Sequence, residues 1–234
     1  MLILALDSST SVVTAAVART GEEDEREMLA EISVPARGAA EALLPAAHAA
    51  LKLAGTDLDE VGRILVGVGP GTFTGIRIAL SAARALALGT GAALSVNSTL
   101  AALAAPALAS VENPDVLAVL DARRREVFAQ RFGAEGARGE ILCLVPEELA
   151  AAFAVEAGPG ASLLVVGDGA MRYRETLSGV GRIPPAVSTL HRVTAAGHVL
   201  SADLSPVPVG EAVPLYVREP DAEVRRGLNP WSKV

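Results

Sequence analysis

Residues 67–89 read GVGPGTFTGIRIALSAARALALG, and this stretch decides the fold. It begins inside an apolar run, residues 64–68, that predicts a buried strand, and it continues into an Ala-rich segment that predicts a helix from about Ile76 to Leu88. The glycines between them allow a sharp turn, and Thr72 or Thr74 can cap the helix. A strand, a glycine-rich turn and a helix in this order indicate an α/β protein.

The glycine-rich turn leaves two interpretations open. The start of the following helix presents free N–H groups that suit an anion. Alternatively, the glycines serve only a close approach of strand and helix. A Walker A loop is excluded, because that motif needs a lysine directly after its last glycine and Ile76 stands there.

Upstream, three apolar segments (residues 2–6, 12–17 and 29–34) predict strands, with the turn Asp7-Ser8-Ser9-Thr10 after the first. A carboxylate in such a turn can hold a metal–nucleotide complex through water. The alternative is that Asp7 and Ser9 only satisfy N–H groups of the turn itself. Residues 39–54 predict a helix, in which Pro45 should either produce a kink or mark the first residue.

The second half of the chain repeats this arrangement. A predicted strand at residues 116–120 leads to Asp121 and an arginine-rich turn, and residues 126–132 alternate like a half-buried strand. A later apolar run ends in Gly167-Asp168-Gly169, where the glycines either let a nucleobase lie against the backbone or form a plain turn. We interpret the repetition as two duplicated α/β lobes. The first lobe should comprise residues 1–96 plus about 190–218, the second residues 97–189, and residues 219–234 a tail.

Composition excludes several classes of protein. The chain has 234 residues and a formal net charge of −7, which disfavours a stand-alone nucleic-acid binder, although Arg123–Arg125 form a local basic patch. Cys143 is the only cysteine and none of the three histidines is paired at i, i+4, so no metal site is expected. Without a basic leader or an uninterrupted apolar span, we expect a cytoplasmic protein that does not contact a membrane.

Four motifs together resemble the TsaB family, the tRNA threonylcarbamoyladenosine biosynthesis subunit. They are LALDSST (residues 4–10), the stretch 67–89, LAVLDARRREVFAQ (117–130) and PLYVREPDA (214–222). The resemblance extends from residue 1 to about residue 222. It implies an actin/Hsp70-like, ribonuclease H-like fold with two duplicated lobes.

The resemblance also implies a role and partners. The chain would pair with a catalytic TsaD-type paralogue and be joined by a TsaE-type P-loop ATPase, and it would reach tRNA only through that complex. The isolated chain is expected to form a homodimer. The pairing surface would be built from residues 39–54 and 74–88, with the contacts made by Leu43, Leu44, Ala47, Leu51, Gly75, Ile76, Ala79, Leu80, Ala82 and Ala83.

A vestigial nucleotide cleft is the second site that the resemblance implies. No cofactor would be required, and binding of ATP or ADP stays open. A working actin-like ATPase needs small residues near the β-phosphate, where this chain has Arg123–Arg125, so hydrolysis by this chain alone is not expected. The cleft residues would be Asp7, Ser8, Thr10, Gly69, Gly71, Thr72, Asp121, Gly167 and Gly169.

The sequence leaves three functions to be compared. A non-catalytic subunit that activates an enzyme partner fits a histidine-poor chain with a small-residue helical face. A stand-alone actin-like ATPase or small-molecule kinase would need a second carboxylate as base, for which Asp121 is the candidate, and a second glycine-rich phosphate loop. A metallopeptidase would need a metal-ligand set that the sequence does not offer.

Overall fold

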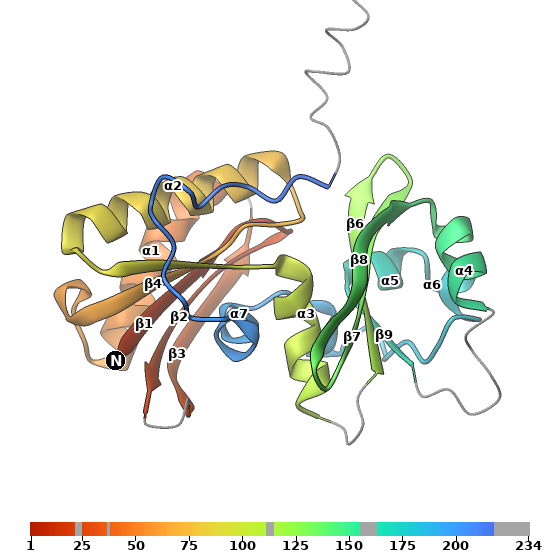
Figure 1. Ribbon diagram of the computed structural model, residues 1–234, viewed down its shortest axis with the longest axis horizontal. Helices are drawn as coiled ribbons and strands as arrows, with labels where there is room; N and C mark the ends of the chain where they lie inside the picture. The colour runs from red at the N-terminus through yellow and green to blue at the C-terminus, as the bar shows by residue number, and fades with distance from the viewer. Residues whose placement is uncertain (22–24, 37, 111–114, 155–162, 218–234) are drawn as a thin grey trace, which may run out of the picture.

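The computed structural model describes residues 1–21, 25–36, 38–110, 115–154 and 163–217. The predicted tail, residues 219–234, and Arg218 lie outside these ranges. Two β-sheets stand apart, with helices on their faces and between them (Figure 1). Of the residues described, no helix is both long enough and apolar enough to cross a bilayer.

The first sheet has the strand order β3-β2-β1-β4-β5. Strands β1, β2 and β3 are antiparallel neighbours, whereas β4 and β5 run parallel to β1. The elements of this part of the chain are β1 (Leu2–Asp7), β2 (Val12–Thr20), β3 (Arg26–Pro35), α1 (Ala39–Ala54), η2 (Leu58–Glu60), β4 (Val61–Gly67), α2 (Phe73–Thr90) and β5 (Ala93–Asn97).

The second sheet repeats this pattern in the order β8-β7-β6-β9. Three antiparallel strands are again followed by a parallel one, β9, next to the first strand of the set. The predicted duplication is therefore confirmed. The elements are α3 (Thr99–Leu108), β6 (Asp115–Arg123), β7 (Glu126–Gly133), β8 (Gly136–Leu144), α4 (Pro146–Ala154), β9 (Leu164–Val166), α5 (Asp168–Arg172), α6 (Arg174–Leu177), η3 (Thr189–His191) and α7 (Ala195–Ser201).

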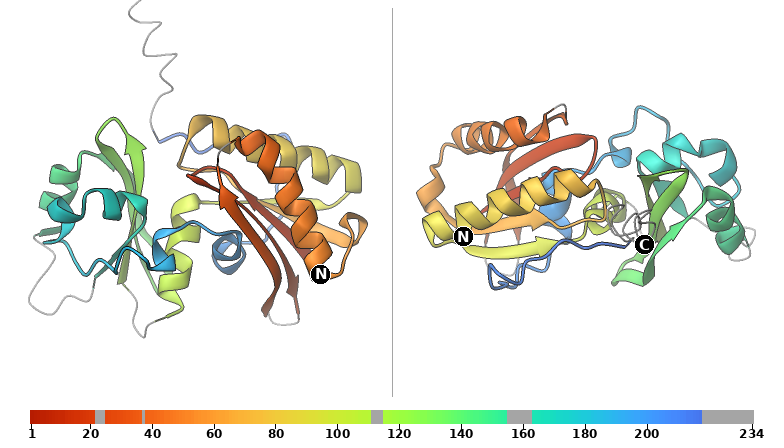
Figure 2. Two further views of the ribbon diagram at one scale, coloured as in Figure 1. Left: turned by 180° about the vertical axis from the view of Figure 1, so that it is seen from behind. Right: turned by 90° about the horizontal axis from the view of Figure 1, so that it is seen from above.

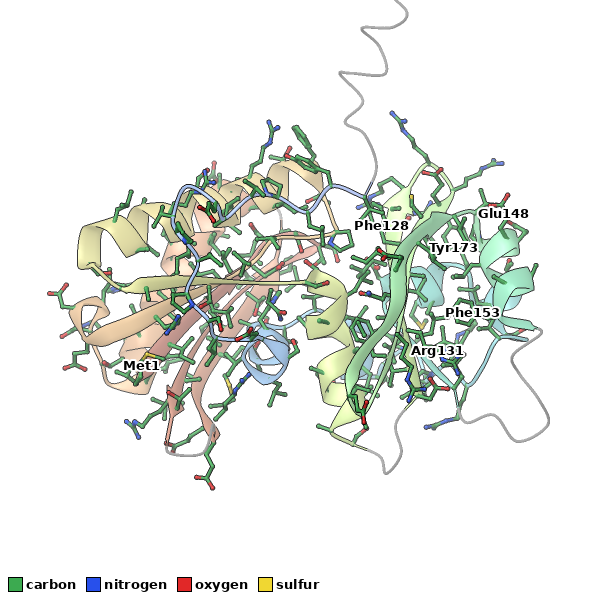
Figure 3. All side chains as sticks on the ribbon, in the orientation of Figure 1. Met1, Phe128, Arg131, Glu148, Phe153 and Tyr173 are labelled. Carbon is green, nitrogen blue, oxygen red and sulfur yellow. The ribbon has the colours of Figure 1, made fainter. Side chains whose placement is uncertain are left out.

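Apolar side chains on both faces of each sheet explain the layers. Helices α1 and α2 lie side by side over one face of the first sheet, and α7 covers the other face (Figure 2). The second sheet packs α3 on one face and α4 to α6 on the other. In Figure 3 the side chains of Phe153 and Tyr173 lie in this last layer, between the sheet and α4.

Helices α3 and α7 meet where the two lobes join. Their backbones approach so closely that a Cβ atom at Gly197 would overlap the carbonyl oxygen of Ala102. After α7 the chain runs along β5 and α2 as an extended segment, residues 202–217, which we call the strap. The strap is held by hydrogen bonds from Val207 N to Leu94 O (2.8 Å) and from Leu215 N to Val68 O (2.8 Å). The strap returns the end of the described chain to the first lobe.

Two details of the helices differ from the sequence predictions. Helix α2 begins at Phe73, three residues earlier than predicted, because Thr72 has extended backbone angles and forms the N-cap. Helix α1 runs from Ala39 to Ala54 through Pro45, so the prediction that it begins at the proline is wrong. Pro45 lies on the exposed side, while the inward side of α1 buries apolar residues that hold the helix in place.

Candidate functional site

The turn after β1 holds a fully buried aspartate. The Asp7 Oδ1 atom accepts hydrogen bonds from Ser9 N (2.7 Å) and Ser9 Oγ (2.8 Å). Its Oδ2 atom lies 2.9 Å from Nε2 of His198, which is also fully buried. Both carboxylate oxygens are therefore bound within the protein, and Asp7 does not reach the surface as a ligand for a metal–nucleotide complex.

Helix α7 supplies the histidine, and neighbouring residues fix its orientation. Asn97 Nδ2 lies 3.3 Å from His198 Nδ1 and donates to Ser201 Oγ at 2.8 Å. With the amide in this orientation Nδ1 accepts, so Nε2 carries the hydrogen that points at Asp7. A Cβ atom at Gly67 would overlap Asp7 Oδ2 and lie 2.8 Å from the imidazole, so only glycine leaves room for this pair.

The glycine-rich loop packs directly on the same turn. Thr72 N donates to Ser9 O (2.6 Å), and Ser8 Oγ donates to Gly75 O (2.8 Å). Cβ atoms at Gly71 and Gly75 would overlap the backbone oxygens of Ser9 and Ser8. The close-packing interpretation of these glycines is thus supported. Thr72 is the N-cap residue, but its side chain makes no capping hydrogen bond, and Thr74 lies inside the helix.

A cavity of about 620 Å³ opens beside this turn. It is lined by hydroxyl groups of the turn and by the first residues of both α1 and α2, neither of which has a side-chain cap. Free N–H groups at two helix starts, together with hydroxyls and one guanidinium, favour an anion. The second lobe contributes Arg123. The lining residues are Ser8, Thr10, Ser11, Pro35, Ala36, Gly38, Ala39, Ala40, Thr72, Thr74, Gly75, Ile78 and Arg123.

Of the nine residues predicted to form a nucleotide cleft, three line this cavity and six do not. Ser8, Thr10 and Thr72 line the cavity. The other six are not among its lining residues, namely Asp7, Gly69, Gly71, Asp121, Gly167 and Gly169.

The second lobe places Asp121 in an ion-pair cluster instead. Its Oδ2 atom lies 2.9 Å from Arg172 Nη1 and 3.4 Å from Arg123 Nη1, and its Oδ1 atom accepts from Arg123 N (3.0 Å). The Asp121 N–H donates to Asp168 Oδ1 (3.0 Å). Burial raises the pKa of the Asp168 carboxyl above its ordinary value, and the nearby charge of Asp121 raises it further, while the hydrogen bond from Asp121 N opposes the shift.

The glycines after β9 also serve packing. A Cβ atom at Gly167 would overlap Val119 O, and one at Gly169 would lie 2.8 Å from the carbonyl carbon of Leu120. His191 holds this loop, since its Nδ1 accepts from Gly167 N (3.1 Å) and its Nε2 lies 3.1 Å from Pro184 O. These contacts favour the plain turn over a nucleobase platform. Among the described side chains, no group of three or more His, Cys, Asp or Glu is placed to hold a metal ion.

The last residue of β6, Arg123, and the two turn residues before β7, Arg124 and Arg125, all have left-handed backbone conformation. Their φ angles are 63° for Arg123, 52° for Arg124 and 64° for Arg125, and all three are exposed. Two-residue hairpin turns of this type normally contain Asn-Gly, because a side chain with positive φ costs about 1–2 kcal/mol.

The helical face predicted to bind a partner is largely buried within its own lobe. Ala79 and Ala83 are fully buried against the first sheet. Of the ten predicted contact residues only Leu44 is exposed (50 %) and Ala82 partly exposed. The prediction that the small-residue stripe forms the partner surface is wrong for these residues, because small side chains let α2 pack on its own sheet. The buried members are Leu43, Ala47, Leu51, Gly75, Ile76, Ala79, Leu80 and Ala83.

The outward face of the same helices carries other residues. On α2 these are Thr74, Arg77, Ser81, Ala85 and Leu88, and on α1 they include Ala40 and Leu44. Sequence reasoning also assigned no role to His198, which lies 191 residues from Asp7. No local pattern marks such a pair; only the fold brings α7 under β1.

Comparison with known proteins gives consistent results. Residues 33–165 match the family model of TsaD, tRNA N6-adenosine threonylcarbamoyltransferase. An uncharacterized protein of Mycobacterium tuberculosis is 32 % identical over 94 % of this chain and 93 % of its own length. The tRNA threonylcarbamoyladenosine biosynthesis protein TsaB of Haemophilus influenzae is 31 % identical over 60 % of this chain and 58 % of that protein. The structure of YeaZ from Pseudomonas aeruginosa superimposes with a TM-score of 0.70 at 27 % identity, covering 92 % of this chain and 99 % of YeaZ. The predicted actin/Hsp70-like, duplicated two-lobe fold is confirmed.

Proposed function

The chain belongs to the TsaB family, and on that premise we propose that it is a non-catalytic subunit in tRNA threonylcarbamoyladenosine biosynthesis. It pairs with a catalytic TsaD-type paralogue and makes it competent to transfer threonylcarbamoyl to the adenosine beside the anticodon, in tRNAs that read codons beginning with A. A TsaE-type P-loop ATPase joins the pair, and tRNA is reached only through the complex.

The main support is the state of the Asp7 carboxylate. In an actin-like enzyme an aspartate in this turn would face the nucleotide, whereas here both oxygens are bound by Ser9 and His198 inside the core. Asp121, the candidate for a second carboxylate, is paired with Arg172 and Arg123. A stand-alone ATPase or kinase would need one of these groups free to act as base or metal ligand. Neither arrangement favours that alternative.

The pairing surface that we propose is the outward face of α1 and α2. Its central residues are small or apolar and exposed, namely Ala40 and Leu44 on α1 and Ser81 and Ala85 on α2. Small side chains allow helices of two subunits to approach closely, as in a helix bundle. We propose that the isolated chain uses the same face to form a homodimer.

The cavity at the start of these helices is a proposed binding site for the phosphates of ATP or ADP, without hydrolysis. It offers hydroxyl groups, helix N–H groups and the Arg123 guanidinium. Binding of ADP to the purified chain, measured by calorimetry, should weaken in an Arg123→Ala variant. Equal affinity in both proteins would remove the cavity from consideration.

The decisive experiment measures threonylcarbamoyl transfer to tRNA by the purified TsaD-type and TsaE-type proteins of the same organism, with and without this chain. Transfer that depends on this chain supports the subunit role. Full transfer without it would refute that role, and ATP turnover by this chain alone would revive the stand-alone enzyme.

A further inference from the structure

Two of the four diagnostic motifs meet at one exposed point of the surface. Tyr216, at the end of the strap, stacks on Phe73, the first residue of α2, with ring centroids 5.5 Å apart and planes inclined by 23°. The guanidinium carbon of Arg77 lies 3.7 Å from the centre of the Phe73 ring. Arg77 Nε also donates a hydrogen bond to Tyr216 Oη at 2.9 Å. We call these three residues the aromatic–arginine cluster.

Burial does not explain this cluster. The chain contains only seven aromatic residues, and two of them lie in this cluster. Phe73 is 42 % exposed and Tyr216 is 40 % exposed. Exposing an aromatic ring to water is unfavourable in free energy, and burial against another surface removes this cost. Tyrosine, arginine and phenylalanine are also enriched at the centres of protein–protein interfaces.

The cluster holds a guanidinium in a fixed orientation. Stacking on Phe73 sets the plane of the Arg77 group, and the hydrogen bond to Tyr216 uses one of its five N–H groups. Among the residues that the structure describes, Arg77 has no other hydrogen-bond or ion-pair partner. Arg77 is exposed, and the two terminal nitrogens of its guanidinium suit bidentate binding of a carboxylate.

The charge of α2 points to the same ligand. This helix carries two arginines and no acidic residue, although the whole chain has a net charge of −7. Arg84 contacts the strap, because its Nη2 donates a hydrogen bond to Ala212 O at 2.6 Å. Arg77 is the exposed arginine of α2, whereas Arg84 is half-buried, and Arg77 lies between Thr74 and Ser81 on the outward face of that helix.

We propose that the aromatic–arginine cluster is a hot spot of the interface with the TsaD-type subunit, in which Arg77 binds a carboxylate of that subunit in bidentate geometry. This inference rests on the proposed function and adds to it the chemistry that the partner must present. The cluster is continuous with the outward face of α1 and α2, so one partner surface covers both. Docking would also desolvate the two rings and so strengthen the ion pair.

The test is a titration of this chain against the purified TsaD-type paralogue of the same organism, with the dissociation constant measured at low and high salt. Arg77→Ala should weaken pairing by about tenfold or more. Arg77→Lys should recover only part of that loss, because lysine keeps the charge but not the planar fork. Arg192→Ala is the matched control: it removes one exposed arginine outside α2 and should leave the affinity unchanged. Thermal unfolding of each variant separates lost binding from lost folding.

The possible outcomes are distinguishable. If the wild-type chain and the paralogue do not pair, the proposed function fails. If they pair and Arg77→Ala binds as tightly as wild type, only the hot spot is overturned. Loss of homodimer alone would assign the cluster to a second copy of this chain, and loss of tRNA affinity with an unchanged heterodimer would assign it to RNA; both results contradict the proposal. Full recovery by lysine would contradict the bidentate geometry.

Discussion

Asp7 and Asp121 occupy corresponding places in the two lobes, since each lies near the end of the first strand of an antiparallel set, β1 or β6, and precedes a short turn to the next strand. In the first lobe the carboxylate is fully buried and bound by His198 and Ser9. In the second lobe the side chain of the aspartate is 8 % exposed and is bound by two exposed arginines, Arg172 and Arg123. The two lobes share the same strand arrangement, but the aspartates of their two turns contact different residues. The first turn has become part of the core, whereas the second has become a charged surface.

The largest effect should come from helix α2, which packs on the buried turn of the first lobe. Ala79→Asp places a charge at a fully buried position in an apolar core, so we expect the chain not to fold, a loss of more than about 4 kcal/mol. Ala85→Asp, on the exposed side of the same helix, should cost less than about 1 kcal/mol, chiefly through helix propensity. Urea unfolding followed by circular dichroism measures both. Similar stability of the two variants would mean that the inner face of α2 is not part of the core.

A smaller but still large loss is expected when the buried aspartate loses its partner. His198→Ala leaves the Asp7 carboxylate with only Ser9, so we expect a loss of about 3 kcal/mol in the free energy of unfolding. The matched change in the second lobe is Arg172→Ala, which removes a partner that is 54 % exposed and should cost less than about 1 kcal/mol. If both variants lost the same amount, the contrast between the two aspartates would be refuted.

The arginine turn should respond in the opposite direction. Arg125→Gly removes the strain of a side chain at φ 64°, so we expect a gain of about 1 kcal/mol in stability. Glycine at an ordinary exposed strand position, for example Ala137→Gly in β8, serves as control and should destabilise the protein. A loss of stability in Arg125→Gly would show that the arginine makes contacts worth more than its strain.

The smallest effect should be the pH-dependent one at Asp168. Because the pKa of this carboxyl is raised above its unfolded value of 3.8, the folded state holds its proton more tightly. The raised pKa therefore stabilises the folded protein fully below pH 3.8. This stabilisation is lost as the pH rises through the pKa of Asp168 in the folded state. Asp168→Asn cannot ionise but can still accept the hydrogen bond from Asp121 N.

The expected result for Asp168→Asn is a modest rise in the unfolding temperature at pH 7 that disappears in strongly acidic buffer. Thermal unfolding over a series of pH values gives this difference directly. A gain that persisted at low pH would have to come from something other than ionisation.

Much of the architecture could be predicted, because residues 39–54 and 61–90 have clear periodicity and strong turn signals. The glycine-rich loop was located correctly, but its role as a close contact with Ser8 and Ser9 depends on backbone atoms far away in sequence. The inward and outward faces of α2 could not be told apart, since alanine occurs on both and hydrophobicity does not separate them. The Asp7–His198 pair could not be predicted from the sequence, because α7 is short and its sequence does not indicate which strand it covers.

The same pair has a consequence for how the protein is made. His198 leaves the ribosome 191 residues after Asp7. At ordinary rates of translation this takes about 10–40 s. Throughout that interval the amino-terminal sheet lacks both α7 and the strap, and the strands of the second lobe are all synthesised before α7. The lobe that is synthesised first is thus the last to be finished, and a nascent chain stalled before α7 would present an unfinished apolar sheet to chaperones.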